Sequence, residues 1–273
     1  MPESSSWDVI LGEASTRTVL GIDFPADGRS EADLAGLAAM IGSEYRFLRA
    51  RPRPARLGEA LSGDAYTESW IESLRRDGRP VLAVLGHRVG CVYAAEIAQA
   101  LGRWQQSPAI ILLDPEPAST RLLSRTFSAE VNANQAFLSA DEIARARRAA
   151  ADIADRQGGI ASVAAEIVNT YLDLLAVPWE RIGLGDLRES KSARSFESRI
   201  TWLAAASQLD PSDTWERSVV IMSADNSGML ETGDPAGGAG NLASRRIFFD
   251  VGRADLLRSN CVADAVREVL GSR

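Results

Sequence analysis

The chain has 273 residues, of which 45% are hydrophobic and 25% charged, and its formal net charge is −7. These values are ordinary for a folded globular protein and exclude a disordered chain. An acidic chain without a basic stripe also argues against a nucleic-acid partner.

The sequence predicts a cytoplasmic protein. The segment 1–6 has no basic stretch followed by an apolar run, so it does not resemble a signal peptide. We expect no membrane segment, because no apolar run approaches the roughly 18 residues needed to span a bilayer. Two cysteines, Cys91 and Cys261, are too few for a disulfide framework and fit a reducing compartment.

In chain order, strand-like runs alternate with helical patterns up to residue 113. The apolar or alternating runs predict strands at 18–22, 44–49, 80–85 and 109–113. The periodic segments predict helices at 30–41, with Ser30 as its cap, and at 65–76 and 90–101. This alternation predicts a mostly parallel central sheet flanked by helices, an α/β fold.

The pattern then changes to helices alone until about residue 217. Ser139 and Glu142 have the spacing of a capping box, which predicts a helix to about residue 156. A one-sided stripe predicts a second helix from 160 that ends before Pro178, and a third covers 194–208.

Two arrangements of this helical block are open. Inserted between two strands, it would form a lid over the carboxyl edge of the sheet, where such folds keep their sites. The alternative is an independently folded helical domain. Our preferred division assigns 1–118 and 216–273 to the sheet core and 119–215 to the lid.

The sheet pattern resumes after the helical block. Strands are predicted at 218–222 and 245–249, and a final helix at 261–270. The Gly-rich segment 233–240 lacks the strand-loop-helix setting of a dinucleotide site, so we interpret it as a connector.

Residues 86–90 read Gly-His-Arg-Val-Gly between an apolar strand and an Ala-rich helix. The spacing is that of the nucleophile elbow, G-x-S-x-G, with Arg88 at the position of the serine. Arginine has no nucleophilic oxygen and stays protonated in proteins. The sequence therefore predicts the turn without its nucleophile.

Taken in order over residues 17–270, these features resemble the thioesterases of nonribosomal peptide and polyketide assembly lines, an α/β-hydrolase family. The resemblance is carried by four segments: Phe24-Pro-Ala-Asp-Gly28, Gly86 to Glu96, Leu112-Leu-Asp114-Pro, and Asp250 to Leu257. It implies an α/β-hydrolase fold with a helical lid and an action on chains held on carrier-protein phosphopantetheine.

The resemblance also implies roles for single residues. Asp114 takes the place of the acid of the triad, and Arg253 takes the place of the histidine. Phe24 lies in the segment 24–28, which takes the place of the family's loop whose backbone amide helps build the oxyanion hole, and Val89 follows the elbow arginine. With Arg88 and Arg253 they form the predicted substrate or anion site.

A working triad needs a nucleophile, a base and a group that orients the base. His87 is the sole histidine, and the family uses this position structurally, so Asp114, Arg88 and Arg253 do not predict a working triad. Cys91, in the first turn of the elbow helix, is interpreted as a packed residue, not a substitute nucleophile. Asp225, at a second strand end where this fold can hold its acid, is interpreted as a loop cap. No set of residues has metal-ligand spacing, and we expect no metal.

Two arrangements of the site and three functions follow. Arg88 and Arg253 either converge with Asp114 into an anion pocket or plug the site. The leading function is non-hydrolytic binding of an acyl or peptidyl carrier protein, a synthase module or its tethered intermediate. The alternatives are a cyclase or isomerase that uses Arg88, Arg253 and Asp114, and a residual hydrolase in which Asp114 activates water. No cofactor is expected beyond phosphopantetheine on a partner carrier protein.

Overall fold

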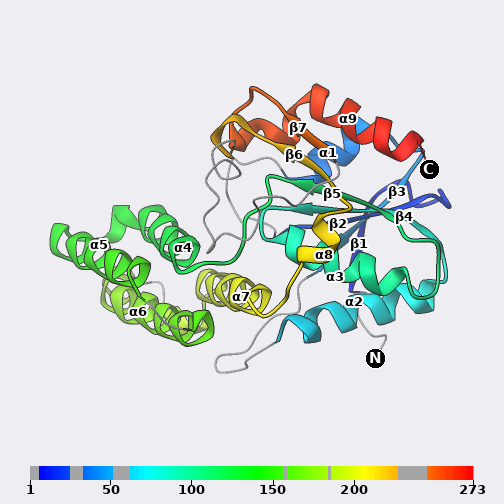
Figure 1. Ribbon diagram of the computed structural model, residues 1–273. Helices are drawn as coiled ribbons and strands as arrows, with labels where there is room; N and C mark the ends of the chain where they lie inside the picture. Colours follow the sequence, from blue (N-terminus) through cyan, green and yellow to red (C-terminus); the bar gives the residue numbers. More distant parts are fainter. Residues whose placement is uncertain are drawn as a thin grey trace. The chain divides into compact units, whose positions relative to one another are not determined.

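The computed structural model describes residues 6–24, 33–51, 62–156, 159–183, 186–226 and 245–272 (Figure 1). The chain divides into two compact units. The sheet unit comprises Met1–Pro52, Asp64–Pro117 and Leu209–Arg273. The helical unit comprises Arg53–Gly63 and Ala118–Gln208. The Gly-rich segment 233–240 lies outside the described residues.

The described part of the sheet unit contains one seven-stranded sheet with the order β1-β3-β2-β4-β5-β6-β7. The strands are β1 (Trp7–Leu11), β2 (Thr18–Ile22), β3 (Arg46–Ala50), β4 (Val81–His87), β5 (Ala109–Leu113), β6 (Val219–Met222) and β7 (Arg245–Phe248). β1 runs antiparallel to β3, and the other neighbours are parallel. The predicted mostly parallel sheet is confirmed.

Helices cover both faces of the sheet. α1 (Leu34–Ile41) and α9 (Asn260–Gly271) pack together on one face, whereas α2 (Gly63–Asp77), α3 (Gly90–Leu101) and the short α8 (Ser212–Trp215) lie on the other (Figure 1). The cap of α1 is Asp33, whose carboxylate accepts from the Gly36 N–H at 3.0 Å. The predicted cap, Ser30, is wrong because the helix begins at Leu34; Ser30 itself lies outside the described residues.

β1 is not among the strands expected from the sequence, and long-range aromatic packing explains it. Trp7 is 5% exposed and lies against Trp70, with ring centroids 6.2 Å apart. The indole N–H of Trp7 donates to the Trp70 carbonyl at 3.1 Å, and Trp70 in turn packs on Tyr66 and Tyr93. These contacts join β1 to α2 and α3. They link residues far apart in the sequence, so a local hydrophobic pattern does not predict them.

The described helical unit contains α4 (Thr120–Ala133), α5 (Ala140–Ala154), α6 (Ile160–Arg181) and α7 (Lys191–Ala206). The predicted capping box is confirmed: Ser139 Oγ accepts from the Glu142 N–H, and Glu142 accepts from the Ser139 N–H at 2.7 Å. α4 is not among the expected elements, although Ser119 caps it and Leu123, Phe127 and Val131 form its buried stripe.

α6 corrects two expectations. It continues three residues past Pro178 to Arg181, and the Ile182 N–H closes the last turn on the Pro178 carbonyl at 3.3 Å. With 22 residues, it is also long and apolar enough to cross a membrane. Ile167, Tyr171 and Leu175 are at most 1% exposed, as in the core helix of a folded unit.

Two glycines set the approach of α3 to the sheet. A Cβ atom on Gly90 would lie 2.1 Å from the Ile22 carbonyl oxygen of β2. A Cβ atom on Gly86 would lie 2.5 Å from Cys91 Cα. Both obstacles are backbone atoms, which cannot turn aside as a flexible side chain can. The glycine spacing at 86 and 90 is therefore a packing requirement.

We predict that Gly90→Ala lowers the free energy of unfolding by about 3 kcal/mol, because the added methyl group overpacks α3 against β2. Urea denaturation measures the loss. Gly271→Ala is the control, since no atom lies within 4 Å of its Cβ position; it should be neutral or stabilising by up to about 1 kcal/mol. Equal stability of the two variants would contradict the packing requirement.

Candidate functional site

Arg88 occupies a strained turn between β4 and α3. Its φ of 53° is in the left-handed region, which costs a non-glycine residue about 1–3 kcal/mol. Main-chain hydrogen bonds hold the turn: the Arg88 N–H donates to the Leu113 carbonyl at 2.9 Å, and the Cys91 N–H donates to the Arg88 carbonyl at 3.0 Å. A sharp, strained strand-to-helix turn is the geometry of a nucleophile elbow. The elbow conformation is therefore present with arginine at its centre.

The elbow lies where the strand order reverses. From β2 the chain goes to β3 on one side, and β4 pairs with β2 on the other. Ligands of open α/β sheets bind at such a switch point, beyond the carboxyl ends of the strands. Phe24 follows β2 closely, and Val89 is the N-cap residue of α3. Residues 25–28 of the predicted oxyanion loop lie outside the described part of the chain.

Asp114 lies at the end of β5 with its side chain fully buried. Its φ is also positive, at 48°. The Ser223 N–H donates to Oδ1 at 2.7 Å, and the Ser223 hydroxyl donates to Oδ2 at 2.6 Å. Ser223 follows β6 and is itself 0% exposed. Asp114 therefore joins the ends of two neighbouring strands.

Arg253 begins the short 3₁₀ helix at Arg253–Arg258 and lies against Asp114. Its Nε is 3.3 Å from Asp114 Oδ2, and its Nη1 is 3.7 Å from Glu116 Oε2. Its backbone N–H donates to Asp225 Oδ2 at 2.7 Å. Asp225 thus acts as an acceptor for a loop amide. One guanidinium, 19% exposed, faces two carboxylates that are 0% and 7% exposed.

Sequence reasoning missed Glu116 and Ser223. Glu116 also reaches the elbow, since its N–H donates to the Arg88 carbonyl at 3.4 Å. The available signals are weak: a second carboxylate two residues after Asp114, and a serine directly after an apolar strand. Among the described residues, no group of three or more His, Cys, Asp or Glu side chains could hold a metal ion.

His87 is the last residue of β4 and is 6% exposed. Its Nδ1 lies 3.3 Å from Asp23 Oδ2, but the geometry is not that of a hydrogen bond. The contact is thus an ion pair only when the imidazole is protonated. His87 lies within the sheet, one residue before the strained turn.

Cys91 is 0% exposed on α3, and its Sγ is 3.7 Å from the Leu113 carbonyl oxygen. Burial raises the pKa of the thiol well above its usual value. Because the thiolate is the nucleophile, a neutral buried thiol does not replace the missing serine.

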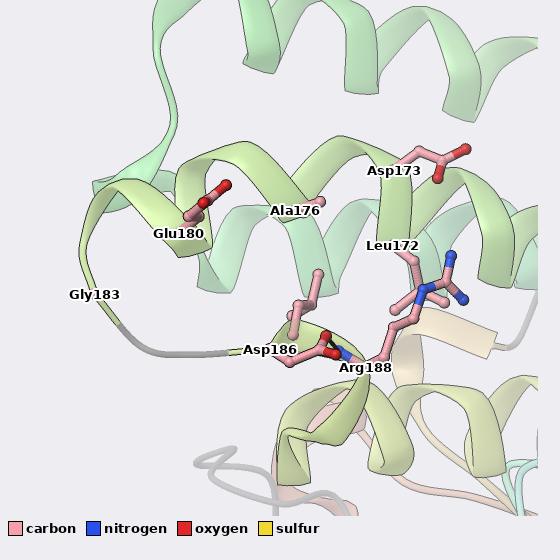
Figure 2. Close-up of a pocket in the computed structure, with 8 residues that line it drawn as sticks. Leu172, Asp173, Ala176, Glu180, Gly183, Asp186 and Arg188 are labelled. Carbon is pink, nitrogen blue, oxygen red and sulfur yellow. Dashed lines mark hydrogen bonds between the residues drawn. The ribbon is translucent and has the colours of Figure 1, made fainter.

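A separate pocket of about 610 Å³ lies in the helical unit, between α6 and the short 3₁₀ helix at Leu187–Glu189 (Figure 2). The buried side chains of Leu172 and Leu187 contribute apolar surface to it. Its charged lining residues are Asp173, Glu180, Asp186 and Arg188. None of the elbow residues lines this pocket, and the sequence motifs give no sign of it.

We predict that Arg253→Met lowers the free energy of unfolding by about 3 kcal/mol, because it removes the guanidinium that lies against the fully buried Asp114 carboxylate. Chemical denaturation provides the measurement. Arg258→Met is the matched control: Arg258 is 54% exposed and 3.9 Å from an exposed Asp255, so its loss should stay below about 1 kcal/mol. A small effect at both positions would show that the buried cluster does not depend on Arg253.

We also expect the two cysteines to react differently. Iodoacetamide should alkylate exposed Cys261 in the native protein and leave Cys91 unmodified, as measured by peptide mass spectrometry. Unfolding in urea should make both thiols reactive. Fast native alkylation of Cys91 would contradict its inert, buried state.

No protein-family model and no curated protein sequence matches the chain. Solved structures do match it. The Vlm2 thioesterase domain bound with a dodecadepsipeptide has a TM-score of 0.55 at 14% identity, covering 99% of this chain and 98% of that one. The NocB thioesterase domain from the nocardicin cluster has a TM-score of 0.54 at 17% identity, covering 98% and 100%.

A third match comes from outside the thioesterases. The bromoperoxidase from Bacillus anthracis has a TM-score of 0.53 at 15% identity, covering 97% of this chain and 94% of that one. At such identities the likeness concerns the fold. The seven-stranded sheet with its flanking helices, and its likeness to these proteins, confirm the predicted fold class: the chain has the α/β-hydrolase fold.

Proposed function

We propose that the chain is a thioesterase-like protein of nonribosomal peptide or polyketide biosynthesis that binds a carrier protein, or its tethered acyl or peptidyl intermediate, without hydrolysing it. The observation that carries the proposal is Arg88 at the centre of an intact elbow. The motif order and the shared fold of the two thioesterase domains support the family.

Each hydrolytic role lacks a suitable group at its position. Arg88 has no nucleophilic oxygen, and Arg253 cannot accept a proton. The sole histidine, His87, is a buried strand residue. Acyl transfer by the triad mechanism needs both a nucleophile and a base, so this site does not support it.

The contacts of Asp114 weigh against the alternative functions. A base for cyclisation, isomerisation or water activation must reach the proton that it removes. The Asp114 carboxylate is 0% exposed and already accepts from Ser223 twice and from Arg253. We therefore assign Asp114 a structural role in the sheet unit.

The same contacts favour a plug at Arg253 over an anion pocket, because one guanidinium faces two buried carboxylates. We propose that Arg88, with the backbone amides of Phe24 and Val89, forms the remaining anion or carbonyl contact near the start of α3. We further propose that the helical unit is the lid. Its main segment, Ala118–Gln208, lies close to the predicted bounds of 119–215.

We predict that the protein binds a carrier loaded with octanoyl-phosphopantetheine and releases no octanoate above the buffer rate. Fluorescence anisotropy of the labelled carrier measures binding, and thiol release measures hydrolysis. The double variant Arg88→Ser with Arg253→His should gain turnover, because it restores a nucleophile and a base beside Asp114. Each single variant should stay at background.

The pair Arg88→Ser with Arg258→His is the matched control, and circular dichroism checks that every variant is folded. Hydrolysis by the natural protein would overturn the non-hydrolytic role. Failure to bind both the loaded and the unloaded carrier would overturn the binding role.

A further inference from the structure

We propose that the sheet unit has a second ligand site, a pocket that takes a planar aromatic carboxylate. The pocket has a volume of about 240 Å³ and lies at the end of α2 and the end of α3. Its lining consists of Leu74, Arg75, Gly78, Arg79, Pro80, Leu101, Trp104 and Gln105. None of these eight residues is acidic.

The walls of this pocket are fixed by hydrogen bonds. The Gln105 side-chain amide donates to the Val81 carbonyl at 2.8 Å and accepts from the Val81 N–H at 3.1 Å, so it holds the turn after α3 against the start of β4. On the other side, Gly78 ends α2 with a φ of +70°, and its N–H donates to the Leu74 carbonyl at 3.0 Å. A preformed pocket does not lose binding energy to ordering its own walls.

Trp104 gives the pocket an aromatic surface. It is 39% exposed, so part of its ring is accessible to a ligand. The guanidinium of Arg75 lies over its ring, 4.5 Å from the centroid, and this cation–π contact holds the indole in place. The exposed part of the ring offers a stacking surface for a second planar group.

The remaining lining determines the class of ligand. Leu74 and Leu101 are at most 4% exposed and provide apolar surface for a ring. Arg79 is exposed and offers a guanidinium fork, which matches a carboxylate in two parallel hydrogen bonds. A cavity of about 150 Å³ holds benzene. A pocket of about 240 Å³ therefore has room for two fused rings.

This pocket lies at the opposite end of β4 from the elbow. Six residue steps separate Val81 from His87, which is about 20 Å along a strand. A ligand bound here does not occupy the proposed carrier-binding site. The experiments therefore test the two proposals independently.

The test uses the full chain labelled with ¹⁵N in its six tryptophan indoles and titrated with 2-naphthoate, followed by NMR. The Trp104 indole signal, assigned by its loss in Trp104→Phe, should shift with saturation at submillimolar ligand. The neutral analogue 2-naphthylmethanol should bind roughly ten-fold more weakly, because it lacks the charge-assisted hydrogen bonds.

Two variants complete the test. Arg79→Gln should weaken 2-naphthoate binding roughly ten-fold and remove the preference for the carboxylate. Arg76→Gln is the matched control: this exposed arginine lies in the last turn of α2, three residues before Arg79, but does not line the pocket, so affinity should not change. Isothermal titration calorimetry, which does not depend on the Trp104 signal, should show no saturable binding to Trp104→Ala and weaker binding to Trp104→Phe. No saturation by 2-naphthoate, a shift confined to another indole, or equal affinities of Arg79→Gln and Arg76→Gln would overturn the proposal.

Discussion

The site depends on the close contact between the start of α3 and the backbone of β2. At Gly90 the Ile22 carbonyl oxygen occupies the space that any Cβ atom would need. This contact fixes the start of the helix, and Arg88, two residues before Gly90, adopts the strained turn that leads into it. None of these constraints involves the side chain at position 88. The two glycines of the elbow are therefore explained by packing alone, and only the residue at position 88 determines the chemistry of the turn.

The Asp114 carboxylate at the end of β5 likewise has a structural role that does not depend on catalysis. In a hydrolase triad the acid orients an imidazole that gains and loses a proton. Here a guanidinium, which stays protonated, contacts Asp114 instead. The carboxylate thus retains a partner and holds the ends of β5 and β6 together through Ser223. The Arg253 guanidinium supplies a fixed positive charge beside Asp114 and cannot take part in proton transfer.

The sequence predicts those parts of the structure whose signal is local. The bounds of β2, α3 and β5 and the capping box at Ser139 agree with the structure because periodicity and capping are encoded within a few residues. β1 could not be found in this way, since its stability comes from Trp7 packing on Trp70, 63 residues away. For the same reason, the motifs point to Asp114 and Arg253 but not to Ser223, which reaches Asp114 only after β5 and β6 pair.

An elbow with arginine favours binding over turnover for an energetic reason. Rate acceleration requires interactions that are stronger in the transition state than in the ground state. Backbone amides at the start of α3 and a fixed guanidinium attract an acyl carbonyl or an anion in its ground state as well. Without a nucleophile, the tetrahedral oxyanion does not form. These contacts therefore cannot bind a transition state more strongly than the ground state. An elbow built around Arg88 therefore suits the proposed binding role and not acyl transfer.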